Sequence, residues 1–390
     1  MEQNGDNKSS GAIKPNLSFE QGVNLVKRLY KLQDVVCLKE FTGYDNQNLL
    51  MEARRPDSEP GSPLQKFVLK LTNTEDSKDF AFHEQLNEIL LLVKGSGIQC
   101  CWPIQNASGK DLTLEKLNFK HKDTEEILQG EFLTRIMTYI PGQFIGGAPL
   151  LTAKMCYEAG QLLGQLSTAL QDYSGDKSMF IKRNHEYAWC LGNVSRVGNL
   201  LHVLKDDSQR KLIREVLDSF QEKVTKREEK LTKGFIHGDF NDYNILVREQ
   251  SSSSVCNGDG PGDNKDVAGI LDFDDTMYSS VVYDIAIAIM YMMQCTNLER
   301  DPMESGGIVL AGYLSKHALS GDDWEALYYC IAARFAQSLV MGLYAHSQQP
   351  QNTYLLSTQK VGWQVLFDLW GQEVNDLYGQ WRKIIKQYND

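Results

Sequence analysis

Residues 237–244 read His-Gly-Asp-Phe-Asn-Asp-Tyr-Asn, and residues 270–275 read Ile-Leu-Asp-Phe-Asp-Asp. Short apolar runs flank the first segment and lead into the second, so both are predicted to lie at the ends of buried β-strands. Asn244 follows Asp239 by five positions, and Asp272 comes where the second strand stops. Carboxylate and amide oxygens are ligands that Mg²⁺ prefers. The alternative is an acidic hairpin exposed to water, which the flanking strands and the second acidic segment disfavour.

Metal-assisted phosphoryl transfer from a nucleotide needs these residue types at this spacing. In kinases the first Asp accepts or orients the proton of the attacking hydroxyl, the Asn five residues later holds one Mg²⁺, and a later Asp holds another. We therefore predict that Asp239 is the catalytic carboxylate and that Asn244 and Asp272 are metal ligands. The residues indicate a small-molecule kinase.

Composition bounds the class of protein. A chain of 390 residues exceeds one average domain, so two unequal lobes are expected. Hydrophobic residues make up 42% of the chain and charged residues 23%, as in ordinary globular proteins. The net charge of -11 argues against a nucleic-acid partner, because nucleic-acid-binding proteins usually present a basic face.

Cysteine spacing and the N-terminal sequence indicate a cytoplasmic protein. The eight cysteines show no Cys-x-x-Cys spacing, so they are predicted to be reduced thiols in an intracellular compartment. The first residues are polar and acidic, unlike a signal or transit peptide. The most apolar stretch, residues 281–293, contains Asp284 and is too short to span a bilayer, so no membrane partner is expected.

Four segments organise the chain. Residues 1–16 are predicted to be a disordered tail, because they show no apolar period. Residues 17–140 are predicted to form an N-terminal nucleotide-binding lobe, and residues 141–390 a C-terminal catalytic and substrate lobe. Residues 249–266 are low in sequence complexity, so a flexible loop is expected between the two catalytic strands.

Hydrophobic periodicity and turn residues predict the elements of both lobes. In the N-terminal lobe we expect a helix at 19–32, a second helix from residue 79, and strands at 37–41, 48–53, 65–71, 112–117 and 131–140. In the C-terminal lobe we expect helices at 152–170, 208–231, 283–295, 307–315, 324–344 and 361–388. The predicted fold class is α+β, with a β-rich first lobe and a larger, mostly helical second lobe.

The two catalytic segments and this order of elements resemble the aminoglycoside phosphotransferase and choline kinase-like family over nearly the whole chain. His-Gly-Asp at residues 237–239 in place of His-Arg-Asp, and the absence of an Ala-Pro-Glu segment, distinguish the chain from most protein kinases. The resemblance implies a two-lobed protein-kinase-like fold, Mg²⁺ as cofactor, and a nucleoside triphosphate, GTP or ATP, as phosphate donor. It also implies a small-molecule amino-alcohol as acceptor.

Within that family, four segments are most similar to the hydroxylysine kinases: residues 241–246, 269–273, 289–293 and 337–341. This resemblance implies transfer of a γ-phosphate, with GTP suspected, to the side-chain hydroxyl of 5-hydroxy-L-lysine. The residues alone leave choline, ethanolamine and homoserine open as acceptors. Protein substrates are disfavoured by the missing activation-segment signature. A nucleotide-binding pseudokinase scaffold should have lost one of four residues that this chain keeps: Lys70, Asp239, Asn244 and Asp272.

The resemblance implies a phosphate-binding lysine in the first lobe. Lys70 lies near the end of a predicted strand and is expected to contact the α- and β-phosphates, although a solvated strand lysine is the plainer interpretation. Glu84 on the following helix is the expected ion-pair partner. Glu88 lies one turn later on the same helix face, so the sequence does not separate the two.

Two further nucleotide contacts are expected from backbone groups. The turn from Gly43 to Asn48 should cover the phosphates, where N–H groups can approach an anion. It holds one glycine, which departs from the Gly-rich loop of protein kinases, so a plain β-turn is a close rival. Met137 and Tyr139, in the predicted connector, should offer backbone groups to the purine edge.

In the second lobe, the remaining assignments concern the acceptor and the scaffold. The resemblance implies that Asp275 and Trp189 contact the substrate. An aromatic ring can cover an alkylammonium group, although a Trp is more often core. Asp274 replaces a glycine common in the family and either faces a cation or points to water. His237 is predicted to brace the catalytic loop, and Asp284 to stabilise it from a helix start.

Overall fold

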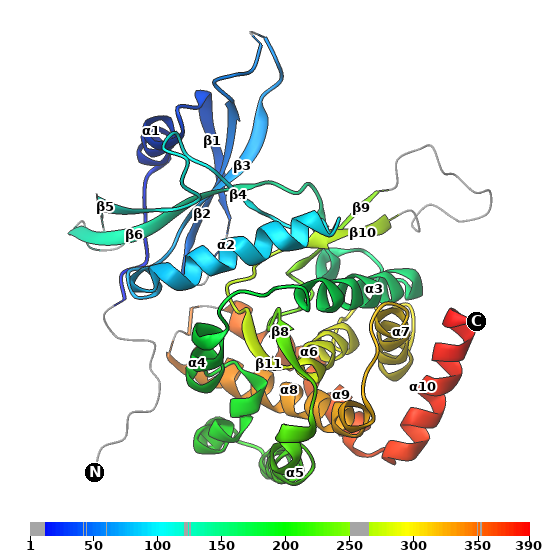
Figure 1. Cartoon of the computed structure of the whole chain (residues 1–390). Coiled ribbons are helices and arrows are strands. Elements are labelled where there is room, and N and C mark those ends of the chain that lie inside the picture. Colours follow the sequence, from blue (N-terminus) through cyan, green and yellow to red (C-terminus); the bar gives the residue numbers. More distant parts are fainter. Residues whose placement is uncertain are drawn as a thin grey trace. The chain divides into compact units, whose positions relative to one another are not determined.

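The computed structural model describes residues 12–41, 43, 45–59, 61–120, 124, 126–249, 265–348, 350–351 and 353–390. The chain divides into two compact units (Figure 1). Unit 1 comprises the described residues of Met1–Gly95 and Cys100–Ile140, and unit 2 those of Ser96–Gln99 and Pro141–Asp390. Residues 1–11 of the expected tail and 250–264 of the expected loop lie outside the described part of the chain.

Unit 1 is built on an antiparallel sheet in the order β1-β2-β3-β6-β4, with β5 paired to β6. Two α-helices and a 3₁₀ turn accompany the sheet. The elements are α1 (Phe19–Tyr30), β1 (Gln33–Phe41), β2 (Gln47–Arg54), β3 (Gln65–Leu71), η1 (Asp76–Lys78), α2 (Phe80–Gly95), β4 (Pro103–Ile104), β5 (Thr113–Lys120) and β6 (Ile127–Thr138).

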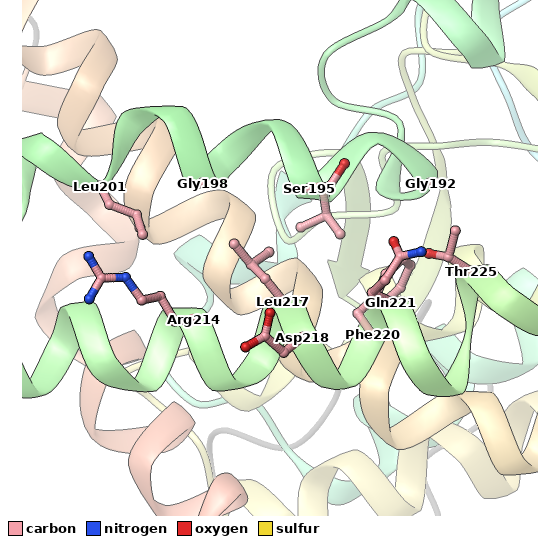
Figure 2. Close-up of a pocket in the computed structure, with 11 residues that line it drawn as sticks. Gly192, Ser195, Gly198, Leu201, Arg214, Leu217, Asp218, Phe220, Gln221 and Thr225 are labelled. Carbon is pink, nitrogen blue, oxygen red and sulfur yellow. The ribbon is translucent and has the colours of Figure 1, made fainter.

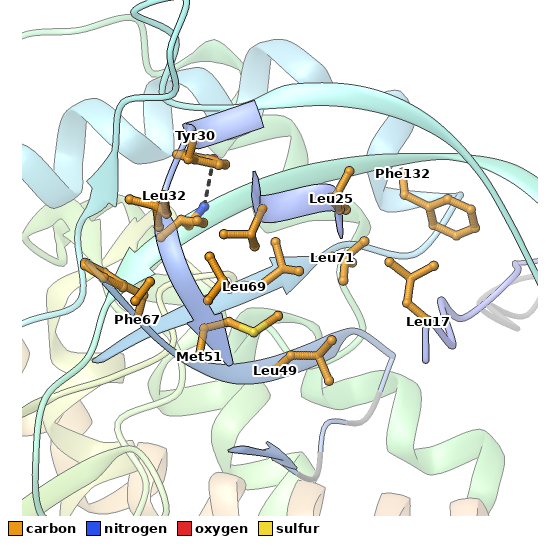
Figure 3. Packing of buried hydrophobic residues seen from close by; sticks show 14 of the residues in the cluster. Leu17, Leu25, Tyr30, Leu32, Leu49, Met51, Phe67, Leu69, Leu71 and Phe132 are labelled. Atoms are coloured by element: carbon orange, nitrogen blue, oxygen red, sulfur yellow. Dashed lines mark hydrogen bonds between the residues drawn. The ribbon is translucent and has the colours of Figure 1, made fainter. Parts of the chain in front are cut away.

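Helix α1 covers one face of this sheet. It begins with a capping box, in which the Ser18 hydroxyl accepts from the Gln21 N–H and the Gln21 side chain accepts from the Ser18 N–H. At the other end, the Tyr30 hydroxyl accepts from the Ile136 N–H of β6 at 2.9 Å. The helix packs into an apolar core shown in Figure 3, whose members include Leu25, Val26, Leu49, Met51, Phe67, Leu69, Leu71 and Phe132.

Helix α2 packs on the opposite face of the sheet. Lys70 of β3 pairs with Arg135 of β6, so their side chains share the face away from the α1 core. Arg135 is 1% exposed and donates to Oδ1 of Asn87 on α2 at 3.1 Å. Lys70 therefore lies on the face that α2 covers, beside a second cation.

Part of the expected tail belongs to unit 1. The Ile13 N–H donates to Thr74 Oγ1 at 2.8 Å, and Pro15 is buried. Residues 12–16 therefore lie against the folded unit, in contrast to the expected disordered tail. The segment is extended and irregular, so its contacts produce no helical or strand period in the sequence.

Unit 2 is mostly helical, with short strands near its catalytic segments. Strands β10, β9 and β7 form one sheet, and β11 pairs with β8. The strands are β7 (Gln143–Phe144), β8 (Lys233–Ile236), β9 (Ile245–Glu249), β10 (Lys265–Ile270) and β11 (Met277–Ser280). The helices are η2 (Ile145–Gly147), α3 (Ala153–Leu170), α4 (Ser178–Glu186), η3 (Leu191–Val203), α5 (Asp207–Lys223), η4 (Thr225–Lys230), α6 (Val281–Met293), α7 (Pro302–Leu314), α8 (Gly321–Gln348), η6 (Thr353–Lys360), α9 (Gly362–Trp370) and α10 (Val374–Asn389).

The core of unit 2 contains α6 and α8. Every residue of α6 is buried. Among the described helices, α8 has the length and apolar composition that a membrane span would need, yet 83% of its apolar window is buried inside the fold. Burial of this kind is what a core helix of a globular fold requires.

Several parts of unit 2 differ from the sequence prediction. The helix expected at 208–231 is α5 followed by the 3₁₀ segment η4. Helix α4 and the long 3₁₀ segment η3 were not expected. Segment η3 contains Gly192 and Gly198, and its 3₁₀ geometry does not produce the 3.6-residue period of an α-helix. The single helix expected at 361–388 is two helices, because α9 ends at a capping residue, Gly371.

Candidate active site

The catalytic loop connects β8 to β9 and is anchored by α6. Gly238 has φ +83°, which glycine adopts readily, and a Cβ at this position would collide with the carbonyl oxygen of Asp275. The N–H groups of His237 and Gly238 donate to the two carboxylate oxygens of Asp284 at 2.7 and 2.8 Å. Asp284 lies in the first turn of α6 and is 1% exposed. One buried carboxylate therefore fixes the backbone just before Asp239.

The His237 ring links the two catalytic segments. Its Nδ1 accepts from the Asp239 N–H at 3.2 Å, so Nε2 is the nitrogen that donates to the carbonyl of Leu271, at 3.0 Å. The ring also packs against Phe273, with centroids 4.7 Å apart. Both ring nitrogens are occupied by backbone groups, which favours a bracing role over proton transfer.

The side chains of Asp239 and Asn244 are in direct contact. The Asn244 Nδ2 donates to the Asp239 carbonyl at 2.9 Å and to Asp239 Oδ2 at 3.0 Å. Asn241 donates to the same Oδ2 at 2.8 Å. Because the amide nitrogen of Asn244 makes these bonds, its amide oxygen is the atom left to face a cation.

Asp272 joins this pair from the end of β10. The Leu271 N–H donates to the carbonyl of Asn244 at 2.8 Å, which places Asp272 one residue from that contact. Asp272 has φ +57°, an uncommon conformation for a residue with a side chain and one that often occurs at functional sites. The structure therefore brings together the three oxygen-bearing residues that the sequence singled out.

The donor set of Asn244 and Asp272 fits Mg²⁺ that arrives with a nucleotide. No group of three or more His, Cys, Asp or Glu side chains within the described residues could hold a metal ion. Mg²⁺ keeps octahedral oxygen coordination and is commonly held by one or two carboxylates together with phosphates and water. One amide oxygen and one carboxylate leave positions for those other ligands.

The Asp239 carboxylate lies in a crowded electrostatic environment. Its Oδ1 is 3.3 Å from Nη2 of Arg334, a residue of α8 that is only 2% exposed. Burial and the neighbouring Asp275 carboxylate raise the pKa of Asp239 to about 7, while the charge of Arg334 and the hydrogen bond from Asn241 act in the opposite direction. Oδ1 of Asp239 therefore contacts Arg334, whereas Oδ2 accepts from Asn241 and Asn244.

The predicted substrate residues adjoin this carboxylate. The Tyr187 hydroxyl donates to Asp275 Oδ1 at 2.6 Å, and Arg183 Nη2 lies 3.6 Å from the same oxygen. Arg183 also donates to the carbonyl of Asp274 at 2.8 Å. The Trp189 ring lies against the Arg334 guanidinium, 5.2 Å from centroid to Cζ. Tyr187 and Arg183, which were not predicted, thus complete the surroundings of Asp275.

In unit 1, the predicted nucleotide residues lie on and beside the sheet. Asn48 of β2 is the cross-strand partner of Lys70. Glu84 and Glu88 are both exposed on α2, on either side of the buried Asn87, so the partner of Lys70 stays a prediction. Lys70 lies on the sheet face that α2 covers, and α2 carries both glutamates.

The turn and the connector are partly described. Lys14 Nζ donates to the carbonyl of Gly43 at 2.5 Å, whereas residues 42 and 44 of the same turn lie outside the described residues. Met137 is buried between Val68 and Pro103 of the neighbouring strands. Tyr139 follows the end of β6 and is partly exposed. Contacts of these residues with a nucleotide stay predictions.

A cavity of about 390 Å³ lies between η3 and α5, as Figure 2 shows. Its wall combines apolar and charged side chains, among them Ser195, Leu201, Arg214, Asp218 and Phe220. None of the predicted site residues lines it. The cavity is therefore separate from the residues that the sequence assigns to chemistry.

Arg334, like Tyr187 and Arg183, is a site residue that the sequence did not single out. It lies within the helix predicted at 324–344. The signal was present, because Arg334 is the one charged residue in the run 331–340, Ile-Ala-Ala-Arg-Phe-Ala-Gln-Ser-Leu-Val. A cation in an apolar helix of this kind must be paired when the helix is buried.

Comparison with known proteins agrees with this geometry. A model of the phosphotransferase enzyme family that includes the aminoglycoside phosphotransferases matches residues 42–324. The chain belongs to this family. It is therefore a small-molecule kinase, an enzyme that transfers a phosphoryl group to an alcohol.

Relatives and a solved structure extend the match over the whole chain. A hydroxylysine kinase from Mus musculus is 31% identical over 97% of this chain and 96% of its own length, and one from Xenopus laevis is 30% identical over 96% of each chain. An amicoumacin kinase solved with AMP-PNP and Ca²⁺ is 16% identical, with a TM-score of 0.61 over 92% of this chain and 96% of its own. The predicted α+β, protein-kinase-like fold class is confirmed.

Proposed function

We propose that this enzyme transfers the γ-phosphoryl group of a nucleoside triphosphate, with GTP the expected donor, to the side-chain hydroxyl of 5-hydroxy-L-lysine. The observation that carries the proposal is the direct contact of Asp239 with Asn244, together with Asp272 on the adjoining strand end. The identity to hydroxylysine kinases over nearly the full chain supports the choice of acceptor.

The roles follow from the contacts. Asp239 orients the acceptor hydroxyl and receives its proton, as in other kinases. Asn244 and Asp272 hold Mg²⁺, which supplies neutralisation of phosphate charge when bound. Lys70, paired with Glu84 or Glu88, contacts the α- and β-phosphates, while the 43–48 turn and the Met137–Tyr139 backbone contact the rest of the nucleotide. Catalysis then rests on orientation and charge neutralisation.

The acceptor site favours a hydroxylated amine. In 5-hydroxy-L-lysine an ammonium lies on the carbon next to the hydroxyl, so a hydroxyl held by Asp239 brings the ammonium close to a second acidic group. Asp275 supplies that group, since its charge raises the pKa of Asp239. Choline, ethanolamine and homoserine share parts of this chemistry and are the competing acceptors. We expect the enzyme to work in the cytoplasm, with neither a nucleic acid nor a membrane as partner.

Variants of the catalytic residues test the mechanism. Asp239→Asn should lower kcat about 10²–10⁴-fold, because a positioned general base contributes that much. Asp272→Asn should lower it by a comparable factor and should raise the Mg²⁺ concentration needed for half-maximal rate. Asp172→Asn serves as the matched control, because this carboxylate is exposed and makes no side-chain hydrogen bond or ion pair within the described residues. Wild-type turnover by either site variant would contradict its assignment.

An acceptor panel tests the substrate. The purified protein is incubated with Mg²⁺, GTP or ATP, and 5-hydroxy-L-lysine, choline, ethanolamine or homoserine, and the product is identified by its mass. L-lysine, which differs from the proposed acceptor by the missing hydroxyl, is the matched control. We expect a phosphorylated product from hydroxylysine and none from lysine. Preference for another acceptor would replace hydroxylysine while leaving the kinase assignment intact.

A further inference from the structure

Helix α8 places one fully buried cation against the catalytic carboxylate. Arg334 is 2% exposed, and its Nη2 donates to Asp239 Oδ1 and to the Tyr291 hydroxyl, both at 3.3 Å. Its Cζ lies over the ring of Trp189 and over that of Tyr291, 5.2 and 5.3 Å from the two centroids. A buried guanidinium is costly unless it is paired and hydrogen-bonded, so its position depends on these partners.

The other terminal nitrogen of the same guanidinium holds the segment that carries Trp189, one of the two predicted substrate residues. Nη1 donates to the carbonyl of Trp189 at 3.1 Å and to Gln337 Oε1 at 2.8 Å. Gln337, one helical turn later, donates through Nε2 to the carbonyls of Ala188 and Cys190 at 3.0 and 3.3 Å. Two residues of α8 thus hold three successive carbonyls.

These bonds add to those of a short turn. Residues 187–190 lie between α4 and η3, where the Tyr187 carbonyl accepts from the Cys190 N–H at 3.1 Å and from Asn193 Nδ2 at 2.8 Å. On its other side, the segment reaches the second carboxylate, since the Tyr187 hydroxyl donates to Asp275 at 2.6 Å. A continuous chain of contacts therefore runs from Asp239 through Arg334 to Asp275.

We propose that Arg334 is a positioning residue. Together with Gln337, it holds the Tyr187–Cys190 acceptor segment in a fixed position relative to the Asp239 carboxylate. The inference deepens the proposed function. Arg334 sets the distance between the acceptor segment and Asp239, the carboxylate that receives the acceptor's proton. Gln337 holds the acceptor segment without touching Asp239. The forked guanidinium is required, because its two terminal nitrogens reach Asp239 and the Trp189 carbonyl at the same time. A lysine ammonium lacks this planar geometry.

Two variants separate the two roles. Arg334→Lys keeps a positive charge near Asp239 but loses the forked connection to the Trp189 carbonyl. We expect kcat at saturating acceptor to fall about 10–100-fold, because a small misplacement of reacting groups costs that much. Gln337→Met keeps the shape of the side chain and removes the carbonyl anchors. We expect it to raise the KM of the acceptor about 10-fold, with a smaller change in kcat.

Controls distinguish positioning from a merely structural contribution. The KM of the nucleotide should stay within about 3-fold of wild type in both variants, since neither residue is assigned to it. Arg382→Lys, an exposed arginine of α10 with no ion pair in the described structure, should behave as wild type. If the losses merely follow the fraction of unfolded protein, kcat and KM per folded molecule will be unchanged, and the proposal is wrong.

A measurement that needs no turnover separates this inference from the proposed function. Hydrogen exchange of the peptide spanning residues 187–195 should be at least about 10-fold faster in Arg334→Lys and Gln337→Met than in wild type, because local opening exposes amides that the anchors protect. If the wild-type enzyme phosphorylated none of the acceptors, the proposed acceptor would be overturned. Hydrogen exchange would still test whether Arg334 and Gln337 hold the acceptor segment. Unchanged exchange together with unchanged kinetics would overturn the role of Arg334.

Discussion

At the scale of single residues, the most consequential buried contact outside the chemistry is made by Asp284. Its two oxygens accept from successive backbone N–H groups of the catalytic loop. In Asp284→Asn, one oxygen is replaced by an NH₂ group that faces an N–H, and a buried donor is left without an acceptor. We expect the free energy of unfolding, measured by urea denaturation, to fall by about 2–4 kcal/mol, and activity to fall with it.

An exposed carboxylate that also accepts from two successive backbone N–H groups, both on its Oδ1 oxygen, supplies the control for this prediction. Asp206 caps α5 and also accepts from two successive N–H groups, those of Ser208 and Gln209. Because Asn is as good an N-cap as Asp, Asp206→Asn should change stability by less than about 0.5 kcal/mol. Equal effects of the two substitutions would show that burial of Asp284 is not what makes it important.

Proximity that depends on local spacing could be predicted from the sequence, and contacts between distant parts of the chain could not. The proximity of Asp239, Asn244 and Asp272 was expected because a loop and a strand end define their relation. Arg334 contributes from α8, 95 residues beyond Asp239, so nothing local connects the two. Tyr187 was not predicted, since its bond to Asp275 also joins distant parts of the chain.

At the scale of elements, the contact between α3 and α7 depends on glycines. A Cβ at Gly160 would collide with the carbonyl oxygen of Val309, and one at Gly312 with that of Tyr157. Both obstacles are backbone atoms, which cannot move without separating the helices. Gly160→Ala and Gly312→Ala should each lower the free energy of unfolding by about 1–3 kcal/mol, as measured by urea denaturation.

Gly379 of α10 offers a matched control, for which we expect the opposite change in the free energy of unfolding. A Cβ there meets nothing within 4 Å. Gly379→Ala should therefore raise stability by about 0.5–1 kcal/mol, because alanine is the better helix former. If all three substitutions raised stability, close helix contact would not be the function of the two interior glycines. The apolar period predicted the range of α3 well, but glycines within that period do not reveal which partner helix approaches them.

At the scale of the whole molecule, buried thiols report on each unit separately. Cys100 lies in unit 1, and Cys156, Cys190, Cys295 and Cys330 lie in unit 2, all of them buried. Burial raises the pKa of both the Cys100 and the Cys156 thiols to about 12. The thiolate is the reactive form, so these buried thiols should resist alkylation at pH 8 in the folded enzyme. Cys37 and Cys101, which are partly exposed, should react first.

The same thiols test whether the two units unfold together. Unit 1 has fewer residues from which to bury a core, and smaller folded units bury a smaller share of their surface. In pulsed alkylation at pH 8 with rising urea, followed by mass spectrometry of peptides, we expect Cys100 to become reactive at a lower urea concentration than the four buried thiols of unit 2. Equal midpoints for all five thiols would contradict this order and would mean that the units unfold as one cooperative system.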